Sequence, residues 1–81
     1  MSREEIQKIV TEIVSGVLKC EPHPGLSSES HAEWDSLNHI EIIFSLEEKF
    51  GFEFPREKIH ELGDISSLTD AIAARASDQT G

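Results

Sequence analysis

The residues best suited to chemistry in this sequence surround one serine, Ser36. Asp35 precedes it directly and His39 follows it by three positions, so a hydroxyl, a carboxylate and an imidazole lie close together in sequence. A nucleophilic serine would need a base, an oriented third group and an oxyanion hole in a water-poor site. A chain of 81 residues offers no obvious room for such a pocket. We therefore expect no catalytic residues.

The position of Ser36 also suits a covalently attached anion. Asp35 is a good N-cap, which predicts that a helix begins at Ser36. Free backbone N–H groups and the helix dipole favour negative charge at such a position. A phosphate ester on Ser36 would be stabilised there. On position alone, however, an ordinary first-turn serine is the better interpretation.

Four helices are predicted to position this serine. Ser2-Arg3-Glu4-Glu5 has the form of a capping box, and apolar residues at helical spacing behind it predict a helix over residues 3–18. Prolines, glycine and serines mark residues 19–34 as a long loop. The other helices are predicted over residues 36–50, 55–62 and 67–76, before a polar tail over 77–81. Ser67 has cap-like spacing to Asp70 at the start of the last one. No run alternates as a strand does, so we expect an all-α fold, a four-helix bundle with a long first loop and a short third helix.

The helix predicted over 36–50 has a core side and an outer stripe. The residues on the core side, expected to pack on the first helix, are Ile42, Ile43, Leu46 and Phe50. The outer stripe interleaves apolar and acidic side chains: Leu37, Ile40, Glu41, Phe44, Glu47 and Glu48. Because these carboxylates have no use in a core, we interpret the stripe as a docking surface with a hydrophobic anchor and a charged rim. The alternative is that Ile40 or Phe44 fills the gap left by the short third helix.

Length and charge limit the possible functions. Eighty-one residues make one domain, and 7 Lys and Arg against 16 Asp and Glu give a net charge of −9. This charge argues against a nucleic-acid binder and against anchoring to an anionic membrane, and favours a basic partner protein. An acidic mimic of nucleic acid is disfavoured by the apolar residues within the stripe. No stretch approaches the roughly 20 apolar residues of a membrane span.

Cysteine and histidine usage excludes the usual metal and disulfide frameworks. The single cysteine, Cys20, cannot form an internal disulfide and suits a reducing compartment. The four histidines show no ligand-pair spacing, so we expect no metal site. We expect a cytoplasmic monomer.

The residues around Ser36 resemble the acyl carrier protein family. Asp35-Ser36-Leu37 follows a Pro/Gly loop and precedes an acidic-apolar helix that ends in Leu46-Glu47-Glu48-Lys49-Phe50. The helix order, the long first loop, the short third helix after Phe54-Pro55 and the acidic balance extend the resemblance over the whole chain. Because the chain starts at Met1 without flanking linkers, we expect the discrete type of carrier.

The resemblance implies a function and a cofactor. Ser36, flanked by Asp35 and Leu37, would carry 4′-phosphopantetheine, installed from coenzyme A by a separate phosphopantetheinyl transferase. Asp35 would help to hold the metal used during loading. The thiol of the arm would hold acyl groups as thioesters, so that the protein is a non-catalytic carrier in fatty-acid, polyketide or related biosynthesis.

The resemblance also implies partner enzymes and residues that could line a site for the acyl chain. The outer stripe of the second helix would present apolar contacts and acids to basic patches on acyl-activating, synthase or acyltransferase enzymes. The residues that could shelter an acyl chain are Ile42, Leu46, Ile59 and Leu62. Trp34 is expected to pack the end of the loop onto the bundle rather than to shield the attachment point. The alternative function is an unmodified acidic helical module that binds a basic partner through the second helix.

Overall fold

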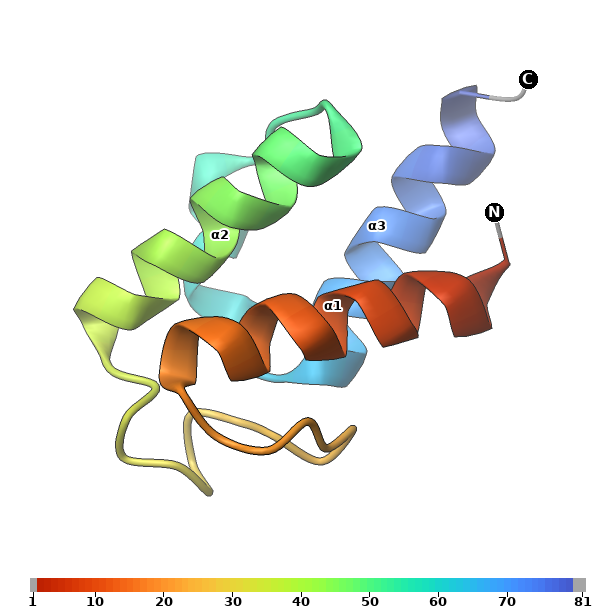
Figure 1. Ribbon diagram of the computed structural model, residues 1–81. Helices are drawn as coiled ribbons and strands as arrows, with labels where there is room; N and C mark the ends of the chain where they lie inside the picture. Colours follow the sequence, from red (N-terminus) through yellow and green to blue (C-terminus); the bar gives the residue numbers. More distant parts are fainter. Residues whose placement is uncertain (1, 80–81) are drawn as a thin grey trace.

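The protein folds as an all-α bundle, as its sequence predicts. A computed structural model describes the backbone of residues 2–79 and the side chains of residues 2–75. Its elements are α1 (Arg3–Leu18), α2 (Ser36–Phe50), the 3-10 helix η1 (Arg56–Glu61) and α3 (Ile65–Gln79) (Figure 1). The described residues contain no strand, and their β-type pairing is limited to an isolated bridge between Ser27 and Asp64.

The capping box predicted for the first helix is formed. The Ser2 hydroxyl accepts the Glu5 N–H at 3.2 Å, and a Glu5 carboxylate oxygen accepts the Ser2 N–H at 3.3 Å. Downstream, α1 buries Ile6, Val10 and Val14, which recur every four residues and so share one face. The first helix is therefore fixed at its start by local bonds and along its length by packing.

The last two helices differ from the sequence prediction. Asp64, rather than Ser67, supplies the cap of α3: its Oδ1 accepts the N–H of Ser67 at 2.6 Å, and the helix begins at Ile65, two residues earlier than predicted. The helix continues to Gln79, so residues 77–79 of the predicted tail are helical, and residues 80–81 lie outside the described residues.

The short third helix is of the 3-10 type and one residue shorter at each end than predicted. Bonds from the Lys58 N–H to the Pro55 carbonyl and from the Leu62 N–H to the Ile59 carbonyl, at 3.0 and 3.2 Å, show its i to i+3 pattern. Such tight helices are used in short pieces. This segment connects α2 to α3 and lies beside the start of α2.

The core forms where α1 packs against both α2 and α3 (Figure 1). It also includes loop residues and residues around η1: the buried set outside the three α-helices is Leu26, Trp34, Phe54 and Leu62. Phe50, predicted on the core side of α2, is only half-buried, because it is the last residue of that helix and lies at the edge of the core. No helix in the described part of the chain combines the length and the apolar character needed to cross a membrane.

Two main-chain bonds tie the long loop to the junction between η1 and α3. The Ser28 N–H donates to the Gly63 carbonyl at 2.8 Å, and the Ile65 N–H donates to the Leu26 carbonyl at 3.2 Å. Leu26 is also buried. The loop is thereby held across the molecule, and its end at Trp34 delivers the chain to the start of α2.

Candidate functional site

Ser36 is exposed at the first position of α2. Asp35 caps this helix: its Oδ1 accepts the Asn38 N–H at 2.9 Å, and its carbonyl accepts the His39 N–H at 2.8 Å. Within the described part of the chain, the hydroxyl of Ser36 and the N–H groups of Ser36 and Leu37 form no hydrogen bond. An anion attached to Ser36 would therefore meet free donors and the positive end of the helix dipole.

Two side-chain contacts reach across Ser36 from the helix to the preceding loop. The Asn38 amide donates to the carbonyl of Glu33 at 2.7 Å. The Trp34 indole N–H donates to Nδ1 of His39 at 2.9 Å. The chain is thus fastened on both sides of the serine while its hydroxyl stays exposed. The sequence did not single out Asn38, although its position three residues after the N-cap was a local signal for it.

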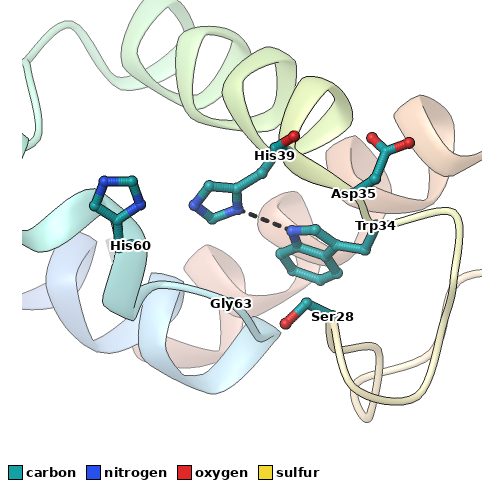
Figure 2. Close-up of a pocket in the computed structure, with 7 residues that line it drawn as sticks. Ser28, Trp34, Asp35, His39, His60 and Gly63 are labelled. Carbon is teal, nitrogen blue, oxygen red and sulfur yellow. Dashed lines mark hydrogen bonds between the residues drawn. The ribbon is translucent and has the colours of Figure 1, made fainter.

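Trp34 packs into the core rather than over Ser36. Its side chain is 4% exposed and belongs to the core cluster. Figure 2 shows the indole and His39 pointing toward each other and Asp35 pointing away from them. The other ring nitrogen of His39, Nε2, lies 2.7 Å from the carbonyl oxygen of Ile59 in η1. Because both nitrogens have other partners, His39 does not serve Ser36 as a base.

A pocket of about 200 Å³ opens beside Ser36. The residues that line it come from the loop, the start of α2 and the η1 segment: Ser28, Trp34, Asp35, Ser36, His39, His60 and Gly63 (Figure 2). The exposed hydroxyl, the free helix donors and this pocket together fit a serine that carries a phosphodiester-linked group.

The outer stripe of α2 is largely at the surface. Leu37 is 81% exposed, Phe44 62% and Ile40 41%, and Glu41 and Glu48 are exposed as well. Large apolar side chains this exposed are typical of binding sites when they lie together. The alternative, in which Ile40 or Phe44 fills the gap left by the short third helix, is therefore disfavoured.

Glu47 differs from the other acids of the stripe. It is half-buried, and its Oε2 accepts the Phe54 N–H at 2.8 Å. The expectation that this carboxylate has no structural use was wrong, because the turn at Gly51, with φ of 75°, brings the chain after α2 back against the helix. The contact spans seven residues and has no periodic signature in the sequence.

A second pocket, of about 160 Å³, lies between α2 and the η1 segment. Its apolar lining is contributed by Ile40, Ile43, Phe44, Phe54 and Ile59. Of the four residues that the resemblance suggested for sheltering an acyl chain, Ile59 is in this lining. The other three, Ile42, Leu46 and Leu62, are buried in the core instead.

The described residues contain no cluster of side chains suited to binding a metal ion. No group of three histidine, cysteine, aspartate or glutamate side chains there is arranged to hold a metal ion. Cys20 is half-buried and packs against the core.

Comparison with known proteins identifies the family. A family model described as "Phosphopantetheine attachment site" matches residues 8–72, which include the whole of α2. The chain is 36% identical over 75 residues to an acyl carrier protein of Rubrobacter xylanophilus, and likewise to one of Thermosynechococcus vestitus, covering 89% of this chain and 93% of each relative. It is 32% identical over 76 residues to an acyl carrier protein of Acidothermus cellulolyticus, covering 90% of both.

These matches extend over nearly all of the bundle, and they agree with the geometry at the start of α2. The cofactor of such a domain is phosphopantetheine, and the domain carries this group without catalysing a reaction itself. This chain belongs to the acyl carrier protein family.

Proposed function

We propose that the protein holds acyl intermediates as thioesters on a 4′-phosphopantetheine arm attached to Ser36, and delivers them to enzymes of fatty-acid, polyketide or related biosynthesis. The observation that carries the proposal is the exposed Ser36 hydroxyl at the first position of a helix capped by Asp35. When bound, the arm supplies a terminal thiol that forms thioesters. The protein supplies the attachment point and the surface by which enzymes recognise it.

During loading, the Ser36 oxygen forms a bond to the phosphorus of the phosphopantetheine half of coenzyme A. The bond from that phosphorus to the adenosine nucleotide half breaks, and the serine proton passes to a base of the transferase. The free N–H groups of Ser36 and Leu37 would stabilise the negative charge of the resulting phosphodiester, together with the helix dipole. The Oδ1 of Asp35 accepts the Asn38 N–H, and the Asp35 carboxylate would help to hold the metal ion used by the transferase.

The exposed stripe of α2 is the proposed docking surface. Leu37 and Phe44 supply the apolar anchor, and Glu41 and Glu48 supply an acidic rim for basic patches on partner enzymes. The proposed partners are the phosphopantetheinyl transferase and acyl-activating, synthase or acyltransferase enzymes. With a single cysteine, the chain suits a reducing compartment, and we propose that it acts in the cytoplasm as a monomer.

Intact-mass measurement tests the attachment. The protein is incubated with coenzyme A and a broad-specificity phosphopantetheinyl transferase, alongside Ser36→Ala and Ser66→Ala. Ser66 is an exposed serine in the first turn of α3 and so provides a matched control. We expect one phosphopantetheine mass on the wild type and on Ser66→Ala, and none on Ser36→Ala. No addition to the wild type, or addition to Ser36→Ala, would contradict the proposal.

A second candidate is an unmodified acidic module that binds a basic partner through α2. The 81% exposure of Leu37 favours this function as much as the first. The same experiment separates the two: an unmodified module would resist loading, yet lose partner binding when Glu41 is changed to Lys.

A further inference from the structure

Trp34 is buried although it lies only two residues before the attachment serine. Its indole N–H therefore needs a partner inside the protein, and Nδ1 of His39 provides it at 2.9 Å. The two rings are tilted by 31° with centroids 6.2 Å apart. Among the described residues, every buried side-chain nitrogen and oxygen has a partner. The indole therefore depends on His39 for its hydrogen bond.

The geometry indicates which ring nitrogen of His39 accepts and which donates. An indole nitrogen can only donate, so Nδ1 of His39 accepts and carries no proton. The proton of the neutral ring is then on Nε2, which donates to the Ile59 carbonyl at 2.7 Å. We call the two bonds, from Trp34 to His39 and from His39 to Ile59, the Trp–His relay. A second proton on Nδ1 would face the indole N–H and break the first bond.

The relay joins the three segments that surround Ser36. Trp34 ends the loop, His39 is in the first turn of α2, and Ile59 belongs to η1. The pocket beside Ser36 has Trp34 and His39 in its wall and His60, the neighbour of Ile59, opposite them (Figure 2). Loss of the relay would remove one of the two side-chain bonds that fasten the chain before Ser36, and also the bond that joins α2 to the η1 side of this pocket.

We propose that Trp34 and His39 are positioning residues for the loading of Ser36, acting through the Trp–His relay. The inference rests on the proposed function of Ser36. Neither residue touches the reacting atoms: they fix the backbone that presents the hydroxyl to the transferase. Loading should therefore require a side chain at position 39 that accepts the indole N–H and reaches the Ile59 carbonyl.

Two other titratable groups share the pocket with His39. Asp35 precedes the serine, and His60 faces the pocket from η1. His39→Gln keeps both bonds of the relay, because an amide can accept from the indole and donate to the Ile59 carbonyl, whereas His39→Leu removes both. His60→Gln is the matched control, since it removes the other histidine of the same pocket and leaves the relay intact.

The first measurement compares the position of the indole N–H resonance of Trp34 by NMR in the wild type and the variants. Trp34 is the only tryptophan of the chain, so the signal is unambiguous. We expect the resonance to move in His39→Leu, which removes the acceptor, and to stay near its wild-type position in His39→Gln and His60→Gln. A resonance that stays in place in His39→Leu, or that moves equally in His60→Gln, would overturn the relay.

The second measurement is the loading rate with coenzyme A and the transferase. His39→Leu should lower kcat/KM for loading roughly tenfold or more through misplacement of the serine, and His39→Gln should restore it. His60→Gln should be loaded at the wild-type rate. Equal losses in His39→Leu and His39→Gln would contradict the relay.

The outcomes distinguish the relay from the function on which it rests. If the wild type is not loaded at all, the proposed attachment at Ser36 fails. If the wild type is loaded and His39→Gln is loaded no faster than His39→Leu, the relay fails and the attachment stands. If His39→Leu does not fold, Trp34→Phe takes its place, because it removes the donor and keeps an aromatic ring in the core. Trp34→Phe should be loaded more slowly than the wild type, and an unchanged rate would overturn the relay.

Discussion

At the scale of the residue, Glu47 lies on the outer stripe of α2 but has a structural role. Its backbone lies on the helix that carries the proposed docking surface, but its Oε2 accepts the N–H of Phe54. Phe54 is buried, so its N–H would lack a partner without Glu47. The acidic residues of α2 are therefore not equivalent, and charge alone does not tell which of them face an enzyme.

We expect Glu47→Ala to lower the free energy of unfolding by about 1–3 kcal/mol, because it leaves the part-buried N–H of Phe54 unsatisfied. Glu48→Ala, which removes an exposed carboxylate from the next position, should stay within about 0.5 kcal/mol of the wild type. Urea unfolding checks both values. Equal stability of the two variants would show that the Glu47 bond contributes nothing to the fold.

At the scale of the element, the capping box makes the start of α1 sensitive to acid. The hydrogen bond from the Ser2 backbone N–H, and then that from its hydroxyl, lower the pKa of Glu5 below the ordinary value of 4.5. The stabilisation from a lowered carboxyl pKa is present above the ordinary value and is lost as the pH falls through the folded value. We therefore expect the difference in the free energy of unfolding between the wild type and Glu5→Gln to shrink as the pH falls below the ordinary pKa. Urea unfolding at several pH values below it checks this expectation. Glu4→Gln, in the same turn but outside the box, should show no such convergence with the wild type.

The proposed docking surface of α2 leads to a prediction about the association and dissociation rates with the transferase. Changing both Glu41 and Glu48 to Lys should slow association with the transferase and remove most of its dependence on salt, while the dissociation rate changes little, as expected for rim charges. Phe44→Ala should instead speed dissociation, because it removes an apolar anchor. Stopped-flow binding at several salt concentrations separates the two effects. Changing both Glu12 and Glu21 to Lys, two exposed acids outside α2, is the charge-matched control. A wild-type association rate insensitive to salt would contradict the electrostatic part.

At the scale of the whole molecule, a small core must hold the helices together. A chain of this size buries only about 60% of the surface that its unfolded state exposes, so its margin of stability is thin. Leu46 is fully buried at the contact of α2 with the core. We expect Leu46→Ala to cost about 2–5 kcal/mol, and Phe50→Ala to cost less than the 3–5 kcal/mol of a fully buried phenylalanine, because Phe50 is half-buried. Thermal and urea unfolding followed by circular dichroism check this order of stability losses. A larger loss in Phe50→Ala than in Leu46→Ala would contradict the prediction.

The sequence alone determined the helical class, the long first loop and the start of α2 at Ser36. These features follow from local signals: a capping residue, a terminating glycine and apolar residues three or four positions apart. In each case the interacting groups are close along the chain, so their spacing is visible without a structure. The exposure of Leu37 and Phe44 also followed from their place on the helical wheel.

Only the tertiary structure decided which other groups meet those helices. The bond between His39 and Ile59 spans 20 residues, and the bond between the Leu26 carbonyl and Ile65 connects the loop to α3. The tight winding of η1 likewise depends on its place between α2 and α3. Such contacts have no period in the sequence, because they arise from the packing of distant segments rather than from the geometry of one helix. The serine at the helix start was therefore predictable, and the side chains that hold it in place were not.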